Sequence, residues 1–268
     1  MGRRRLARPP PSGPKRQSGG RRQPARSGAF RASLELLGGF QLAVHGETVH
    51  LPPCESRVLA SVALRDRAPT RVALAGQLWP DTTNDRALGR LRTALWRLRR
   101  TGRRLLDVTL SDVALSPDVA VDVRELAELS HRMPDVPTPV DEARLEQLSA
   151  AGELLPDWDD EWLVADRERV HQMRLHALEH LSEQLAREGR FGLAIEAALM
   201  AIADDPLRES ARRTLIRVHM AEGNVHDALA QYADFREVMR NELGLEPSPQ
   251  MEALLRDLGI SESIPQDP

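Results

Sequence analysis

Two kinds of hydrophobic periodicity divide this chain of 268 residues. From residue 32 to about residue 51, apolar and polar residues partly alternate in short runs separated by glycine-containing turns, which predicts a small antiparallel sheet. Beyond residue 52, most apolar residues recur three and four positions apart, the spacing of one face of an α-helix. The pattern therefore predicts an α+β N-terminal region followed by an all-α region.

The most regular helical pattern covers residues 82–100. Its apolar side is a series of leucines at spacings of three, four and three, namely Leu88, Leu91, Leu95 and Leu98. Its opposite side carries four polar residues at i, i+4, i+7 and i+11: Arg86, Arg90, Thr93 and Arg97. No acidic residue follows Asp85 in this stretch, so neighbouring cations repel one another unless an anion lies against them. These features favour a helix that binds the phosphate-lined major groove of DNA over an ordinary solvated face.

The flanking elements place this helix third in a series. We expect helices over residues 54–65 and 71–79, the second capped by Thr70, and then a hairpin of strands at 105–110 and 113–115 around Ser111-Asp112. A small sheet, three helices and a hairpin follow in the order of a winged helix, in which the third helix enters the major groove and the hairpin contacts the backbone. An α+β domain without DNA-binding function is the competing interpretation.

The second half contains an internal repeat. Gly189 and Gly223 are 34 residues apart, and so are Ala194 and Ala228. A 34-residue period with glycine in the turn and alanine at the close helix–helix contact is typical of tetratricopeptide (TPR) repeats. Because two units are fewer than a stable stack needs, the helices expected between residues 122 and 187 must complete it as irregular repeats.

Charge is divided in the same way as periodicity. Residues 1–31 carry ten basic residues and no acidic one, and residues 52–104 have a balance of +8, whereas residues 105–268 have a balance of −19. A basic first half joined to an acidic second half suggests one part for a polyanion and another for a different partner. We expect residues 1–31, which are rich in Arg, Pro, Gly and Ser, to be a disordered basic tail.

Several chemistries find no support in the sequence. Cys54 is the only cysteine, which excludes an intrachain disulfide and favours a reducing cytoplasm, and no apolar run approaches the ~20 residues of a membrane span. The sole lysine, Lys15, does not belong to a phosphate-binding loop. His176 and His180 are four residues apart but lack a third ligand. We therefore expect no catalytic residue, no metal, no cofactor, no membrane contact and no enzymatic activity.

Several segments carry a family resemblance. In the first half they are LELLGGFQLAV, the short helix ending in LWP and the TALWRLRR end of the basic helix. In the second half they are DWDDEWLVADRERV, DPLRESARRTLIRVHMAEGNVHDALAQYADF and ELGLEPSP. Together they resemble the SARP family of actinobacterial antibiotic-pathway activators, which join an OmpR-like winged helix to a TPR-like bacterial transcriptional activation domain.

The resemblance implies an organisation and a function. The organisation is a tail at 1–31, a winged-helix DNA-binding domain at 32–124, a TPR-like activation domain at 125–262 and a tail at 263–268. The function is sequence-specific binding to promoter DNA, as a possible homodimer on direct repeats, with recruitment of RNA polymerase to activate a secondary-metabolite gene cluster.

The resemblance also assigns residues. The expected base-reading residues are Arg86, Arg90, Thr93 and Arg97. Arginines expected to contact mainly phosphates are Arg71, Arg92, Arg99, Arg100, Arg103 and Arg104. The loop expected to contact polymerase consists of Asp81, Thr82, Thr83, Asn84 and Asp85.

Two departures from the family pattern keep an alternative open. The hairpin turn is Ser111-Asp112 with no cation, where the family usually has Gly-Tyr followed by a basic residue. Gly89 also lies inside the basic helix, at a cost of roughly 1 kcal/mol relative to alanine. The alternative is a protein-interaction adaptor that uses the TPR-like half and has a degenerate winged helix. A repressor would carry the same motifs as an activator.

Overall fold

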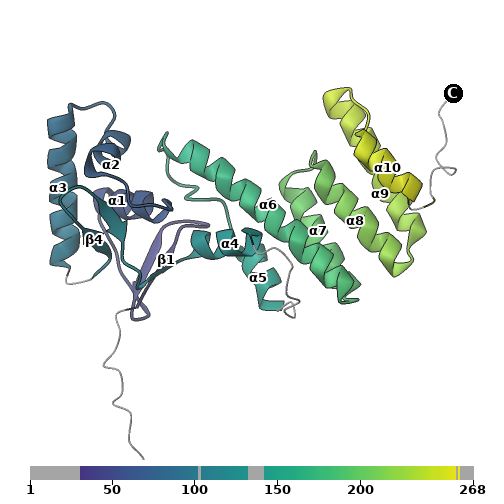
Figure 1. The fold of residues 1–268 in the computed structure, drawn as a ribbon, viewed down its shortest axis with the longest axis horizontal. Helices are drawn as coiled ribbons and strands as arrows, with labels where there is room; N and C mark the ends of the chain where they lie inside the picture. Colours follow the sequence, from purple (N-terminus) through teal and green to yellow (C-terminus); the bar gives the residue numbers. More distant parts are fainter. Residues whose placement is uncertain (1–30, 102–103, 132–141, 258, 260–268) are drawn as a thin grey trace, which may run out of the picture.

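The computed structural model describes residues 31–101, 104–131, 142–257 and 259. Figure 1 shows an elongated molecule with three helices and a sheet at one end and stacked helices at the other. This order of elements confirms an α+β winged-helix region followed by an all-α region. The expected tails at 1–31 and 263–268 lie outside the described residues, apart from residue 31.

The N-terminal sheet has four strands in the order β3-β2-β1-β6. Their bounds are β1 (Ala32–Glu35), β2 (Gln41–Val44), β3 (Glu47–Thr48) and β6 (Val119–Val121). Strands β1 and β2 pair antiparallel, and the turn at His45-Gly46, between β2 and β3, has positive φ at both residues. The sheet expected from the sequence did not include β6. This strand follows the three helices in the chain and pairs in parallel with β1.

The three helices are α1 (Pro53–Ala63), α2 (Arg71–Leu78) and α3 (Asn84–Arg100). Thr70 caps α2 as expected, since its Oγ1 accepts a hydrogen bond from the Ala73 N–H at 3.2 Å. The buried side of α3 differs from the expected leucine series, because it consists of Ala87, Leu91, Ala94, Leu95 and Leu98. Leu88 is only half-buried at the edge of this side. Small alanines thus share the contact of α3 with α1 and α2.

The expected hairpin forms after α3. Strands β4 (Leu106–Val108) and β5 (Val113–Leu115) pair antiparallel, with Val108 opposite Val113. The hairpin is fixed to the start of α2, because the Arg71 N–H donates to the Ser111 carbonyl at 2.8 Å and the Val113 N–H donates to the Pro69 carbonyl at 3.0 Å. The hairpin turn therefore lies beside the first residues of α2.

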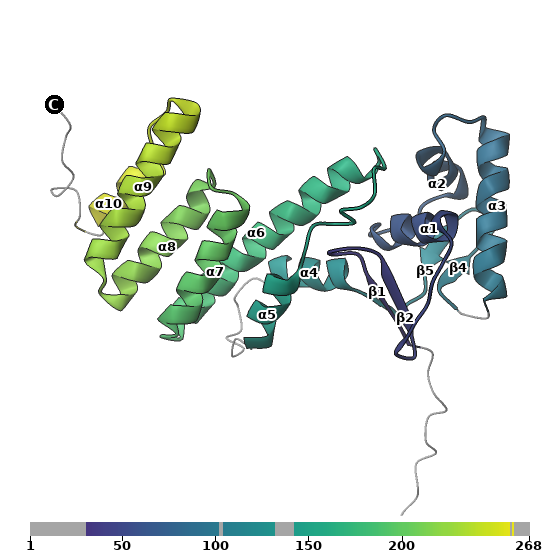
Figure 2. The ribbon, with the colours of Figure 1, turned by 180° about the vertical axis from the view of Figure 1, so that it is seen from behind.

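The remaining helices stack side by side toward the C-terminus (Figures 1 and 2). They are α4 (Asp122–His131), α5 (Glu142–Ala150), α6 (Leu163–Arg187), α7 (Phe191–Asp204), α8 (Glu209–Glu222), α9 (Val225–Leu243) and α10 (Pro249–Asp257). Both repeat glycines, Gly189 and Gly223, have positive φ, and both repeat alanines, Ala194 and Ala228, are fully buried. The repeat read from the sequence is therefore confirmed.

The two regions share one hydrophobic core that runs from Leu34 in β1 to Leu178 in α6 and beyond. Arg57 of α1 forms an ion pair with Asp160, just before α6, and Arg169 of α6 donates to the Leu64 carbonyl at 3.0 Å. A second, smaller cluster lies between α8, α9 and α10. The first turns of α6 therefore hold the three-helix region in place.

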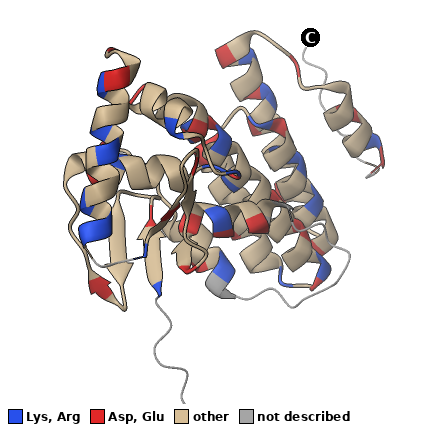
Figure 3. Ribbon diagram, turned by 60° about the vertical axis from the view of Figure 1, so that its left-hand side comes forward, with Lys and Arg blue, Asp and Glu red and all other residues tan. Residues whose placement is uncertain are grey.

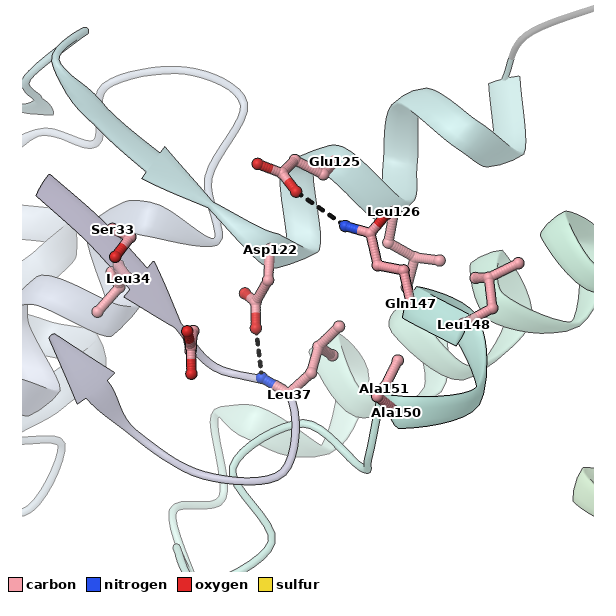
Figure 4. Close-up of a pocket in the computed structure, with 11 residues that line it drawn as sticks. Ser33, Leu34, Leu37, Asp122, Glu125, Leu126, Gln147, Leu148, Ala150 and Ala151 are labelled. Atoms are coloured by element: carbon pink, nitrogen blue, oxygen red, sulfur yellow. Dashed lines mark hydrogen bonds between the residues drawn. The ribbon is translucent and has the colours of Figure 1, made fainter. Parts of the chain in front are cut away.

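A tight backbone contact joins the sheet to the loop before α6. The Gly38 N–H donates to the Glu153 carbonyl at 2.8 Å, and the Leu155 N–H donates to the Leu36 carbonyl at 2.9 Å. A Cβ added at Gly152 would lie 2.8 Å from the Gly38 Cα, so this approach requires glycine. Figure 4 shows the adjoining contact, in which the Asp122 carboxylate accepts from the Leu37 N–H at 2.8 Å.

We expect Ala194→Leu to lower the free energy of unfolding by about 1–3 kcal/mol, because a larger side chain does not fit where α7 meets α6 without displacing one of the helices. The Ala194 carbonyl accepts from Ser182 Oγ at 2.7 Å, which fixes that approach. Ala203→Leu, at an exposed position of the same helix, is the matched control and should be nearly neutral. Urea unfolding followed by circular dichroism measures both variants, and equal effects would contradict close packing at Ala194.

Candidate nucleic-acid interface

The four expected base-reading residues lie together on the exposed side of α3. Arg86, Arg90, Thr93 and Arg97 are exposed, and all four line an open groove of about 600 Å³. Cys54, Trp79, Gly89 and Ala94 line the rest of it. Figure 3 shows basic residues along the length of this helix, with an acidic residue only at its first turn. The burial of the opposite side determines this exposure, since a helix that buries Leu91, Leu95 and Leu98 must turn these four residues outward.

The expected phosphate-contacting arginines have different environments. Arg92, Arg99 and Arg100 are exposed on α3, and Arg71 is half-buried at the start of α2. Arg104 is exposed but donates from Nε to Asp107 Oδ1 at 3.3 Å, so its charge is partly compensated. Arg103 lies outside the described residues.

Trp96 is a further exposed residue of α3 that sequence reasoning did not assign. Its exposed fraction is 56%, and the Arg100 guanidinium carbon lies 4.8 Å from the ring centroid. A cation over an aromatic face is attracted by the ring quadrupole, which restrains the Arg100 side chain. An isolated tryptophan within a basic helix was the signal in the sequence.

Thr93 is restrained by its own helix. Its Oγ1 donates to the Gly89 carbonyl at 3.1 Å, one turn earlier. The hydroxyl proton is therefore occupied, and Thr93 presents oxygen lone pairs and a methyl group to the groove. Of the two, the methyl group suits contact with a thymine methyl.

Arg97 differs from the other base-reading candidates because it pairs with a buried acid. Its Nη1 lies 3.3 Å from Oε1 of Glu55, in the first turn of α1. Glu55 is 1% exposed, and its Oε2 is buried without a hydrogen-bond partner in the part of the chain that the structure describes. The sequence pattern missed Glu55 because the two residues in contact are 42 positions apart in the chain and lie on different helices.

Cys54, beside Glu55, is the thiol of the groove. Burial raises its pKa, and the neighbouring Glu55 carboxylate raises it further. The thiol is therefore protonated at neutral pH, which disfavours a nucleophilic role.

The expected polymerase-contacting residues divide between a loop and a helix. Asp81, Thr82 and Thr83 lie between α2 and α3, whereas Asn84 and Asp85 belong to the first turn of α3. Thr82 Oγ1 donates to the Trp79 carbonyl at 3.2 Å. A second groove of about 510 Å³ joins this loop to the segment before α6, and its lining includes Asp81, Thr82, Arg90, Asp159 and Glu161.

The hairpin turn has an apolar tip. Leu110 is 97% exposed, and the turn beside it contains Ser111 hydrogen-bonded to Asp112. Between residues 104 and 115 the chain carries one cation, Arg104, at the base of the hairpin. Backbone contacts from the turn would therefore be weaker than those of a basic wing.

A third cavity, of about 350 Å³, lies where β1, α4 and α5 meet (Figure 4). Two of its three lining acids have partners, since Asp122 accepts from the Leu36 and Leu37 N–H groups and Glu125 accepts from Gln147 Nε2 at 3.0 Å. Burial raises the pKa of Asp122, and the backbone N–H groups oppose that shift. Within the described residues there is no group of three potential metal ligands. Among the same residues, each helix is too short or too polar to span a bilayer.

Comparisons with known proteins place this geometry in context. The family described as "Bacterial transcriptional activator domain" matches residues 141–258. The regulatory protein AfsR of Streptomyces coelicolor is 30% identical over 251 residues, which cover 85% of this chain and 24% of the relative. AfsR of Streptomyces griseus is 27% identical over 75% of this chain and 22% of the relative. The chain thus spans about a quarter of the length of these relatives.

A solved structure has the same fold. EmbR of Mycobacterium tuberculosis, in complex with a low-affinity phosphopeptide, matches with a TM-score of 0.69 and 23% sequence identity. The match covers 89% of this chain and 67% of that one. It supports the arrangement of a small sheet and winged helix followed by stacked helices.

We expect Arg97→Ala to lower the free energy of unfolding by about 1–3 kcal/mol, because the buried Glu55 carboxylate would lose its counterion. Arg90→Ala is the matched control: Arg90 is exposed, has no ion pair among the described residues, and should change stability by less than about 0.5 kcal/mol. Adding Glu55→Gln to Arg97→Ala should recover most of the loss. Thermal unfolding compares the variants, and the absence of recovery would contradict a charge effect.

Proposed function

Because this chain belongs to the SARP family of bacterial transcriptional regulators, we propose that it is a sequence-specific DNA-binding activator. The observation that carries the proposal is the exposed side of α3, where three arginines and Thr93 line one open groove. A helix of 17 residues presenting this face has the dimensions and charge to enter the major groove.

The residues on α3 divide into two roles. Arg86 and Arg90 face the groove without an ion-pair partner in the described part of the chain, so their guanidinium groups are available to guanine O6 and N7. Arg92, Arg99 and Arg100 flank this face, and we assign them, with Arg71, Arg103 and Arg104, to phosphates. Phosphate contacts would set register and affinity, while base contacts would set sequence preference.

The proposal extends to the transcription machinery. Asp81, Thr82 and Thr83 lie between α2 and α3, and the first two line the groove that reaches Asp159 and Glu161. With Asn84 and Asp85 they form the surface that we propose contacts RNA polymerase. We further propose that the protein acts in the cytoplasm as a homodimer on direct repeats and activates a secondary-metabolite gene cluster.

The alternative of a protein-interaction adaptor is less well supported. The curated relatives are named as regulatory proteins, and an adaptor has no need for a helix whose exposed arginines far outnumber its one acidic residue, Asp85. The acidic hairpin turn remains the feature that fits an adaptor better, and the experiments below test both.

We expect Arg90→Ala to lose about 1–3 kcal/mol of discrimination between a selected operator and single base-pair variants of it, because one specific base contact is removed. The operator is selected from randomised DNA with the unaltered protein, and affinities are measured by gel shift at fixed salt. Arg256→Ala, an exposed arginine in α10, removes the same charge and should keep full discrimination. Unchanged discrimination in Arg90→Ala would remove Arg90 from the base-reading face.

We expect Asp81→Ala to leave operator affinity unchanged within about twofold and to lower transcription from the operator several-fold, because Asp81 belongs to the proposed polymerase contact and does not line the groove that holds all four proposed base-reading residues. Transcription is measured in vitro with purified RNA polymerase. Asp66→Ala, an exposed acid between α1 and α2, is the control of equal charge. Equal transcription from all three proteins would exclude Asp81 from the polymerase contact.

A further inference from the structure

We propose that Glu55 is a positioning residue for sequence readout: it directs Arg97 toward the edge of a base and away from the phosphates. The inference rests on the DNA-binding function proposed above, and it adds a residue that does not itself touch DNA. Glu55 acts through its ion pair with Arg97 across the contact of α1 with α3.

The pair is asymmetric in burial. The Glu55 side chain is 2% exposed, whereas the Arg97 side chain is 57% exposed, and Oε1 and Nη1 are 3.3 Å apart. Glu55 is therefore held by packing under α3, while most of the Arg97 side chain stays accessible from the groove. A carboxylate fixed in this way restrains one end of the guanidinium without covering it.

The ion pair with Glu55 leaves other N–H donors of the Arg97 guanidinium available. Arginine has five N–H groups in a rigid planar fork, and Glu55 engages Nη1. The remaining N–H groups can serve a paired acceptor such as guanine O6 and N7. Because the side chain is already held, less rotamer entropy is lost when it meets a base.

The negative charge of Glu55 favours contact of Arg97 with a base over contact with a phosphate. A phosphate that approached Arg97 would also approach the Glu55 carboxylate, which cannot move away because it is buried. Guanine acceptors carry no net charge and meet no such repulsion. Arg86 and Arg90 have no carboxylate partner among the described residues, so this selection applies to Arg97 within the row.

The second oxygen of Glu55 strengthens the dependence on Arg97. Oε2 is buried and accepts no hydrogen bond from a described residue, so within the described part of the chain the ion pair with Arg97 compensates this buried charge. Releasing Arg97 to a phosphate would therefore leave Glu55 unsatisfied. The pair is thus expected to persist when DNA binds.

The test is Glu55→Gln, a neutral side chain of the same shape. Operator affinity, affinity for random DNA and affinity for each single base-pair variant of the operator are measured over a range of salt concentrations with the full chain. We expect discrimination to fall at least about fivefold at the base pair read by Arg97. Affinity for random DNA should rise, and its logarithm should fall more steeply with the logarithm of salt, by about 0.9, because Arg97 gains a phosphate contact.

Two further variants separate positioning from added charge or misfolding. Asp107→Asn also removes one carboxylate and frees Arg104 from its 3.3 Å contact, so its salt dependence should steepen while discrimination stays at the wild-type level. Glu55→Gln combined with Arg97→Gln should lose discrimination at the same base pair and return to the wild-type salt dependence. A folding defect would weaken binding to operator and to random DNA together, whereas the proposal requires affinity for random DNA to rise while discrimination falls.

The outcomes are distinguishable. Wild-type protein that binds operator and random DNA equally would overturn the proposed function, and the inference with it. Sequence-specific wild-type binding with full discrimination in Glu55→Gln would overturn the positioning role alone. The same loss of discrimination in Asp107→Asn would also overturn it, since charge would then suffice.

Discussion

The burial of one side of α3 against α1 and α2 is the constraint on which the rest of this structure depends. Ala87, Leu91, Ala94, Leu95 and Leu98 form that side, and all five are less than 5% exposed. Because an α-helix has a fixed angular period, burying them leaves a single orientation for the polar side. The row from Arg86 to Arg97 is therefore displayed as a consequence of packing.

Arginine has two different fates in this chain, and the difference separates the two halves. In the helical half, arginines lie against acids: Arg174 with Asp204 and Arg208 with Glu179, each at 2.6 Å. There the ion pairs hold neighbouring helices together, and the acidic partners compensate the charge of the arginines. On α3 the arginines have few acids within reach, so the helix keeps a net positive face. Arginine thus forms ion pairs between helices in one half and gives α3 an exposed positive surface in the other.

Periodicity predicted the elements well, and it failed where contacts join distant segments. The exposed row on α3 and the 34-residue repeat depend on local spacing, so both could be read from the sequence. Strand β6 could not, because three residues become a strand only by pairing with β1. Glu55 was missed for the same reason, since its role appears only when α1 packs under α3. The leucine series was slightly misplaced, because alanines also fit where helices approach closely.

The contact between α1 and the start of α6 joins the N-terminal half to the helical half. Arg57 bridges the Leu78 carbonyl, at the end of α2, and Asp160, just before α6. Arg90, a member of the proposed base-reading row, also lines the groove between the α2–α3 loop and that segment. A partner bound at this loop would therefore contact both halves and lie next to Arg90. The proposed DNA-reading row and the proposed polymerase-contacting loop are therefore adjacent, because Arg90 lines the same groove as Asp81 and Thr82.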